Sequence, residues 1–182
     1  MSNAKEVVAL AGSRPPSLGA GRLVCIDGPA GSGKTTLANE VAALTGAPVV
    51  HMDDLFEGWD GLPHVTAQLD SVLRPLVDDR PGSYRRWDWL ADDWAETIAV
   101  PPVPMLVLEG VGSGARGHAD LVTVLAWVEV PPDLRIARGL ARDGQHLAER
   151  WEQWVLDERA HFDREGTRDR VDLAFDGTRG RL

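Results

Sequence analysis

Residues 22–36 read RLVCIDGPAGSGKTT, and this stretch decides the fold. Its apolar run stops at Asp27, and the next eight residues, 28–35, match the pattern G-x-x-x-x-G-K-[ST] in full. The sequence that follows, TLANEVAALTG, has helical spacing and ends at Gly46, a residue type that commonly closes helices. The pattern therefore lies between an expected strand and an expected helix, which is the setting of a phosphate-binding P-loop.

The composition of this loop suits a polyphosphate. Glycines let backbone N–H groups curl around phosphate oxygens without obstruction from a Cβ, and the following helix directs its positive dipole end to the same point. Lys34 is expected to reach the β- and γ-phosphates, and the hydroxyl of Thr35 to ligate Mg²⁺. The chain has only two lysines, Lys5 and Lys34, against seventeen arginines, and a compact ammonium at position 34 suits a crowded phosphate site. A glycine-rich turn that matches by chance is the alternative.

The bulk properties indicate one globular domain over residues 1–182, with an N-terminal helix and loop in 1–21. A formal net charge of −9 argues against nucleic acid or an anionic membrane as a partner. Cys25 is the only cysteine, which excludes a disulfide within the chain and fits a reducing cytoplasm. No signal-peptide pattern and no apolar run of membrane-spanning length occur. We therefore expect a cytoplasmic protein that is a monomer or a homodimer.

Strand and helix patterns alternate along the chain. Continuous apolar strands that alternate with helices indicate an α/β fold, a three-layer sandwich in which helices cover both faces of a five-stranded parallel sheet. Ligands of such sheets bind beyond the carboxyl ends of the strands. The expected strands are 22–27, 48–51, 105–108, 121–130 and 173–175, and the expected helices are 5–11, 35–45, 65–78, 132–142 and 145–164.

Carboxylates follow two of the other expected strands. Asp53 and Asp54 come after the second strand, where a carboxylate could face the terminal phosphate, take the proton of an attacking hydroxyl and help to hold Mg²⁺. Glu109 closes the third strand at the position of a Walker B carboxylate, where it could bind the water shell of Mg²⁺ or the substrate. The alternatives are that the two aspartates cap a loop and that Glu109 is a cap or turn residue.

Three arginines follow the fourth expected strand. Arg135, Arg138 and Arg142 are spaced by three and four residues, which places them on one face of a helix. Cations on a mobile lid stabilise the charge of a phosphoryl transition state, so residues 132–150 are predicted to form a lid. Arg142 is the preferred catalytic candidate because Gly144 marks the helix end where a lid would hinge. The alternative is a solvated basic face paired with Asp133, Asp143 and Glu149.

The segment 80–100 is rich in tryptophan, and its alternation favours two short strands, which could form a hairpin. Trp87 and Trp89 are two residues apart, which predicts that they share one face of a strand with Asp88 opposite. Together with Arg86 they could form a pocket for a planar or sugar-like substrate, or they could fill the core beneath a small flap. Both interpretations stay open. Trp151 and Trp154, on the last expected helix, are interpreted as packing residues.

Several of these pieces resemble one family. IDGPAGSGKTTLA, MDDLF, RWDW, LEG and R-x-x-R-x-x-x-R-D resemble the uridine kinase-like branch of the P-loop nucleoside and nucleotide kinases, over residues 22–178. The resemblance implies a parallel sheet of order 2-3-1-4-5 and Asp53 as the base that activates the acceptor. It also implies nucleoside contacts, for which Asp60, Trp87 and Trp89 are the nearest candidates. The family's D-H-P-x-A element is not present.

We therefore expect an ATP-dependent kinase that acts on a small hydroxyl-bearing metabolite. The expected catalytic residues are Lys34, Asp53 and Arg142, and the expected metal ligands are Thr35, Asp53 and Glu109. The expected ATP-binding residues are Gly28, Pro29, Ala30, Gly31, Ser32, Gly33, Lys34, Thr35, Thr36 and Arg138. The expected acceptor-binding residues are Asp53, Asp60, Arg86, Trp87, Trp89 and Glu109.

Two other functions stay open at this point. The first is a nucleoside monophosphate kinase, which would need extra cations for the acceptor phosphate, for example Arg85 and Arg86. The second is a regulatory P-loop ATPase without a small acceptor. A GTPase is disfavoured because the chain has no N-K-x-D motif for base recognition.

Overall fold

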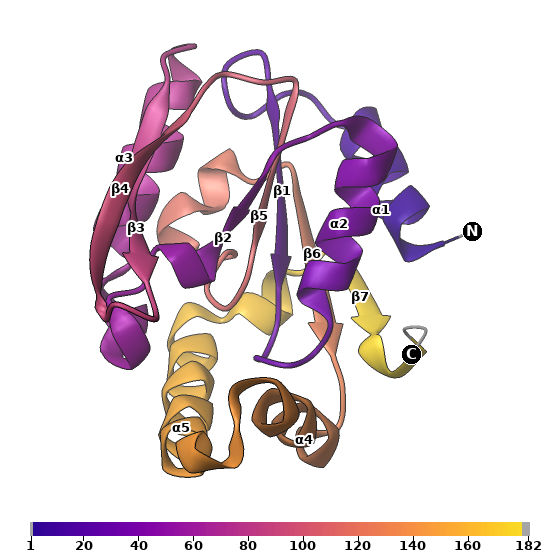
Figure 1. Cartoon of the computed structure of the whole chain (residues 1–182). Helices are drawn as coiled ribbons and strands as arrows, with labels where there is room; N and C mark the ends of the chain where they lie inside the picture. The colour runs from indigo at the N-terminus through magenta and orange to yellow at the C-terminus, as the bar shows by residue number, and fades with distance from the viewer. Residues whose placement is uncertain (1, 180–182) are drawn as a thin grey trace.

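A central parallel sheet organises the computed structural model, which describes residues 2–179. The strand order is β2-β5-β1-β6-β7, which in chain order of the parallel strands is 2-3-1-4-5 (Figure 1). This confirms the predicted fold class and strand order. The strands are β1 Arg22–Asp27, β2 Val49–His51, β5 Met105–Glu109, β6 Val124–Glu129 and β7 Leu173–Asp176.

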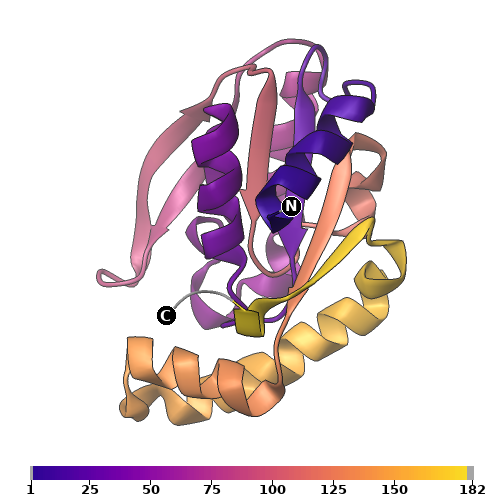
Figure 2. The same cartoon turned by 90° about the vertical axis from the view of Figure 1, so that its right-hand side faces the viewer.

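Alternate residues of β1 pack on opposite faces of the sheet. Leu23 and Cys25 belong to one hydrophobic cluster, whereas Val24 and Ile26 belong to the other. Helices α1 (Asn3–Ser13) and α2 (Lys34–Thr45) cover the second face (Figure 2). The first face is covered by α3 (Thr66–Val77) and by part of α5 (Ala148–Glu165). Because β1 is apolar on both sides, it lies at the centre of the sheet, and the loop that follows it is held by both layers.

A pair of helices lies across the carboxyl end of the sheet. Helix α4 (Pro132–Asp143) ends at Gly144, and α5 returns along it (Figures 1 and 2). A Cβ on Gly139 would lie 2.1 Å from the indole of Trp151, so the two helices approach closely only because this residue is glycine. The last helix begins three residues later than predicted, because Gln145–Leu147 form a short 3-10 turn.

The tryptophan-rich segment is an antiparallel hairpin, which confirms the two predicted strands. It consists of β3 (Gly82–Asp88) and β4 (Asp93–Val100), with a bulge between Arg85 and Trp87. Because β3 ends at Asp88, Trp89 lies in the turn, and the prediction that Trp87 and Trp89 share a strand face is wrong. Trp87 is buried beneath the hairpin, whereas Trp89 is 40% exposed.

One further boundary differs from the expected one. The fourth parallel strand is shorter than 121–130, because Arg116–Leu121 form a 3-10 helix that ends just before it. The connection from β2 to α3 contains the short 3-10 turns Gly58–Asp60 and Leu62–His64. Over the described part of the chain, no helix has the length and apolar character needed to cross a membrane.

The tight contact between α4 and α5 gives a test of the packing. Gly139→Ala should lower the free energy of unfolding by on the order of 2 kcal/mol, because the new methyl group collides with the rigid Trp151 ring. For a chain of this size that lowers Tm by roughly 4–8 °C in a thermal melt. Gly12→Ala is the matched control. Position 12 lies in α1 with no atom within 4 Å of its added Cβ, so this variant should melt at the wild-type temperature or slightly above. Equal melting of the two variants would contradict the packing.

Candidate active site

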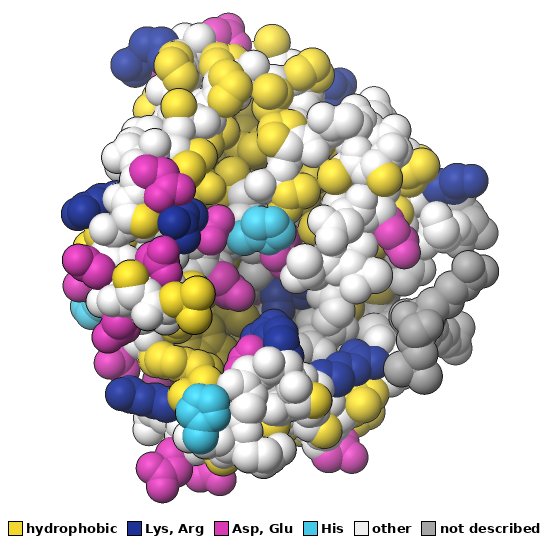
Figure 3. Space-filling model, in the orientation of Figure 1, with side chains coloured by type: hydrophobic (Ala, Val, Ile, Leu, Met, Phe, Trp, Pro, Cys, Tyr) yellow, Lys and Arg dark blue, Asp and Glu magenta, His cyan; other side chains and the backbone are white. Residues whose placement is uncertain are grey.

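A cavity of about 1490 Å³ opens between the carboxyl ends of the strands and the α4–α5 pair. The space-filling view shows it as a hollow with Lys and Arg side chains at its floor and margin and apolar side chains along one wall (Figure 3). One end is lined by the P-loop and the start of α2, and the other by aromatic side chains. The residues between the two ends include Asp53, Asp54, Glu109, Arg138 and Arg142.

The P-loop backbone takes a path that only glycine permits. Gly28, Gly31 and Gly33 all have positive φ, at 134°, 77° and 101°. A Cβ on Gly28 would lie 2.1 Å from the carbonyl oxygen of Val128, and one on Gly31 would lie 2.5 Å from that of Arg135. Gly33 caps α2 without any side-chain hydrogen bond, so the N–H groups of the first turn stay available to an anion.

Lys34 lies on the floor of the cavity and is 7% exposed. Its Nζ donates to the carbonyl oxygen of Pro29 at 2.9 Å, inside the loop itself. Burial lowers the pKa of Lys34, while the nearby carboxylates of Glu109, Asp27 and Asp53 oppose that shift. The ammonium is therefore poorly hydrated and surrounded by negative charge, a setting in which phosphate oxygens would be strong competitors for its protons.

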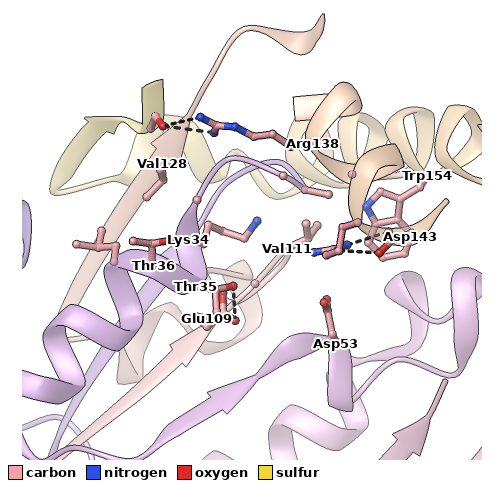
Figure 4. Close-up of a pocket in the computed structure, with 18 of the residues that line it drawn as sticks. Lys34, Thr35, Thr36, Asp53, Glu109, Val111, Val128, Arg138, Asp143 and Trp154 are labelled. Atoms are coloured by element: carbon pink, nitrogen blue, oxygen red, sulfur yellow. Dashed lines mark hydrogen bonds and ion pairs between the residues drawn. The ribbon is translucent and has the colours of Figure 1, made fainter. Parts of the chain in front are cut away.

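Thr35, Glu109 and His51 form a chain of polar contacts beside the lysine. The hydroxyl of Thr35 donates to Oε1 of Glu109 at 3.2 Å (Figure 4), and Nδ1 of His51 lies 2.5 Å from the same oxygen. The hydrogen bond to Glu109 raises the pKa of His51. His51 is a residue that the sequence analysis missed. A signal was available in the sequence, because His51 ends the second expected strand just before Asp53, at the same edge of the sheet as Glu109. In the structure His51 on β2 is paired with Glu109 on β5.

Asp53 faces Lys34 and the Thr35–Glu109 pair from the opposite side of the cavity (Figure 4). It lies on a short 3-10 turn, Met52–Asp54, that follows β2. Its side chain is open to the water of the cavity, yet the surrounding walls reduce its hydration, and this raises its pKa, while Lys34 acts in the opposite direction. The indole Nε1 of Trp89 donates to the backbone oxygen of Asp53 at 2.9 Å, which ties the hairpin to this turn.

The three arginines of α4 have different surroundings. Arg138 lines the cavity and donates to the carbonyl oxygen of Gly177 at 3.3 and 3.4 Å, while Arg142 lines it and pairs with Asp143 at 2.6 Å. Arg135 is buried and pairs with Glu158, so it does not form a common cationic face with the other two. Only Arg138 and Arg142 are thus placed to reach a phosphate.

Aromatic side chains build the far end of the cavity. Trp59 lies at their centre, with edge-on ring contacts of 5.9 Å to Trp89, 6.3 Å to Trp151 and 6.0 Å to Trp154. Phe56 packs on Trp154 at 5.4 Å. All five side chains line the cavity. Trp151 and Trp154 are only 2% and 6% exposed, which agrees with their interpretation as packing residues, and both also border the cavity.

Three of the expected acceptor-binding residues lie outside this cavity. Trp87 is buried against Trp94 with ring centroids 5.0 Å apart, so its ring is used within the hairpin. Arg86 pairs with Glu96 at 2.9 Å, so its guanidinium is used within the hairpin. Asp60 is exposed on a 3-10 turn and does not line the cavity. Trp59, which the sequence analysis did not select, lines the cavity instead, together with Asp54.

The polar groups near Thr35 suit Mg²⁺ bound together with a nucleotide. Within residues 2–179 no cluster of three or more His, Cys, Asp or Glu side chains could hold a metal ion alone. The Thr35 hydroxyl and the carboxylates of Glu109 and Asp53 nevertheless offer hard oxygen ligands on two sides of the P-loop end of the cavity. Mg²⁺ usually takes one or two protein oxygens and completes its octahedron with phosphates and water. These three residues fit that donor set.

A buried carboxylate connects the P-loop to the loop that follows Glu109. Asp27 is fully buried and accepts hydrogen bonds from the backbone N–H groups of Gly28 at 2.7 Å, Gly112 at 3.0 Å and Gly114 at 2.8 Å. Burial raises its pKa to about 6, and the three backbone donors and Lys34 limit that rise. Asp27 therefore connects the P-loop to the loop after Glu109.

The strand order and the loop between β1 and α2 together define the fold of the P-loop kinases. No protein-family model matches the sequence, and no curated protein does. Many solved structures resemble this chain, and two of them illustrate the shared fold. A possible uridine kinase from Bacillus stearothermophilus is 22% identical, with a TM-score of 0.57 over 86% of this chain and 89% of the other. A candidate fructose transport system kinase from Silicibacter sp. is 20% identical, with a TM-score of 0.64 over 96% of this chain and 99% of the other.

The raised pKa of Asp27 predicts a pH-dependent difference between two variants. Its folded-state pKa of about 6 lies above the ordinary value of 3.8, so ionising the buried group destabilises the fold as pH rises from 4 to 7. Asp27→Asn lacks this ionisation. Denaturant melts at pH 4 and pH 7 should show the stability of the wild type falling relative to Asp27→Asn by ~2 kcal/mol, and any constant cost of the amide cancels in that comparison. If the free energies of unfolding of the wild type and Asp27→Asn differ by the same amount at pH 4 and pH 7, the raised pKa of Asp27 is contradicted.

Proposed function

We propose that this protein is an ATP-dependent phosphotransferase whose acceptor is a small molecule with a hydroxyl group and a flat or apolar body. One observation supports this most strongly. A single cavity has the P-loop at one end and, at the other, a group of aromatic side chains that we call the aromatic chamber (Phe56, Trp59, Trp89, Trp151 and Trp154). Between these two ends the carboxylate of Asp53 faces Lys34. A P-loop accounts for the nucleotide, and an acceptor would account for Trp59 and Trp89, whose rings stay accessible at the other end of the cavity.

On the donor side, the chain's own cations balance the charge of the transferring phosphoryl group. The P-loop N–H groups hold the phosphates, and Lys34 exchanges its bond to Pro29 for phosphate oxygens. Arg142 and Arg138, which line the same cavity, add charge-assisted hydrogen bonds. Thr35, Glu109 and Asp53 would hold Mg²⁺ when it is bound with the nucleotide, and the metal would supply positive charge that offsets the charge of the phosphates.

On the acceptor side, Asp53 orients the hydroxyl and accepts its proton. The acceptor oxygen forms a bond to the γ-phosphorus, the bond from that phosphorus to the bridging oxygen of ADP breaks, and the hydroxyl proton moves to the Asp53 carboxylate. Because the base must be ionised, the raised pKa of Asp53 makes the reaction fall off as pH drops through that pKa. The rings of Trp59 and Trp154 would hold the acceptor body and exclude water.

The two alternatives account for fewer of these features. A nucleoside monophosphate acceptor would need extra cations, but Arg86 pairs with Glu96 and Arg85 bonds to backbone oxygens within the hairpin. The acceptor end instead carries the carboxylates of Asp53 and Asp54, which repel a phosphate. A regulatory ATPase would have no use for the aromatic chamber. A panel of nucleosides, sugars and monophosphates with ATP consumption as readout separates the three.

We further propose that the partner is this small molecule alone, without nucleic acid or a membrane, and that the protein acts in the cytoplasm as a monomer or a homodimer. The net charge of −9 supports the exclusion of polyanionic partners. Gel filtration with light scattering would determine the oligomeric state.

Lys34→Ala tests the donor side. Removing the ammonium should lower kcat with the best acceptor of the panel by about a hundredfold or more, because a preorganised charge at the transferring group is lost. Tm should hold or rise, since a poorly hydrated buried charge is removed. Lys5→Ala changes the other lysine, which is exposed on α1, and should keep wild-type turnover. Near wild-type ATP binding and turnover in Lys34→Ala would refute the proposal.

Asp53→Asn tests the acceptor side. The amide keeps the shape but cannot accept the proton, so kcat should fall by about a hundredfold or more. The Kd for ATP, measured by calorimetry without Mg²⁺, should change by less than about threefold, because the P-loop is untouched and the metal-holding role of Asp53 does not enter. Asp78→Asn, at the exposed end of α3, is the control and should match the wild type. A kcat for Asp53→Asn within a few fold of the wild type would exclude Asp53 as the base.

A further inference from the structure

One face of α5 is buried along its length. Its buried residues are Trp151, Trp154, Glu158 and His161, spaced by three and four so that they form one stripe. The two tryptophans line the aromatic end of the cavity. Glu158 is 1% exposed, which is unusual for a carboxylate and requires partners that compensate for its lost hydration.

The partners of Glu158 come from the P-loop and from α4. Its Oε2 accepts a hydrogen bond from the backbone N–H of Ala30 at 2.9 Å, and its Oε1 lies 2.5 Å from Nη1 of Arg135. Burial raises the pKa of Glu158, and the N–H of Ala30 and the charges of Arg135 and Lys34 oppose that shift. One side chain thus joins three segments that are far apart in the sequence.

Backbone packing reinforces the same junction. A Cβ on Gly31 would lie 2.5 Å from the carbonyl oxygen of Arg135, so α4 rests directly on the P-loop one residue after the bond to Ala30. Arg135 is itself 7% exposed. A displacement of the Glu158–Arg135 pair would therefore shift the backbone of the P-loop at Ala30 and Gly31.

We infer that Glu158 is a positioning residue of the nucleotide site, which holds the P-loop in its phosphate-binding shape through the N–H of Ala30 and the guanidinium of Arg135. It touches no phosphate itself. The inference rests on the nucleotide half of the proposed function. Because Trp154 lies one turn away on the same helix and packs on Phe56, α5 also sets the distance between the donor loop and the acceptor chamber.

The first test is Glu158→Gln, with Mg·ATP as the probe in isothermal titration calorimetry. The amide oxygen can still accept from Ala30, but Arg135 loses its charged partner and the junction loosens. The Kd for Mg·ATP should rise about tenfold, the equivalent of one good hydrogen bond. Glu152→Gln, on the exposed face of the same helix, is the matched control and should bind like the wild type.

The second test separates positioning from stability. In the double variant Arg135→Leu with Glu158→Leu, apolar side chains replace a buried ion pair, a change that often leaves stability unaltered. We expect Tm near that of the wild type but a Kd for Mg·ATP still raised about tenfold, because the N–H of Ala30 has lost its acceptor. A double variant with both Tm and the Kd for Mg·ATP at the wild-type values would show that Glu158 has a merely structural role, and it would overturn the inference.

These results are independent of the acceptor. Weaker Mg·ATP binding in both variants, with no acceptor phosphorylated by the wild type, would sustain the inference and refute the proposed function. Wild-type affinity in Glu158→Gln would overturn the inference and leave the proposed function standing. A wild-type protein that fails to bind Mg·ATP would overturn both.

Discussion

The close approach of the P-loop backbone to its neighbours is the constraint on which the site depends. Gly28 lies against the carbonyl of Val128 on β6, and Gly31 lies against that of Arg135 on α4. Because neither position has room for a Cβ, the loop, the central strands and α4 form one packed unit. The backbone N–H groups of the loop can converge on a phosphate only while that unit is intact.

Charge balance is the second physical theme of the site. Lys34 has Asp27, Glu109, Asp53 and Glu158 as electrostatic neighbours, so its buried ammonium is surrounded by carboxylates. Each carboxylate has a different task in this account. Asp27 and Glu158 bind backbone N–H groups and fix loops, whereas Glu109 and Asp53 face the cavity. An incoming polyphosphate would displace the bond from Lys34 to Pro29 and bring its own counter-ion to offset the added negative charge.

The positions of the residues around the P-loop could be predicted from the sequence because they depend on local patterns. The loop, the strand before it and the helix after it are contiguous, and Asp53 and Glu109 were found from their place at strand ends. The acceptor half depends on long-range packing. Trp59 meets Trp151 and Trp154 only because α5 folds back over the sheet, and no spacing within 80–100 indicates that. Trp87 is likewise buried against Trp94 through the pairing of β3 with β4, and Glu158 gave no local signal.

The measurement that tests the account most directly is transfer of labelled γ-phosphate from ATP to a panel of uncharged alcohols and nucleoside monophosphates, with the products separated and identified. The account predicts label on the hydroxyl oxygen of an uncharged, ring-bearing alcohol. Label that appears only as free phosphate, or only on the phosphate of a monophosphate, would contradict it.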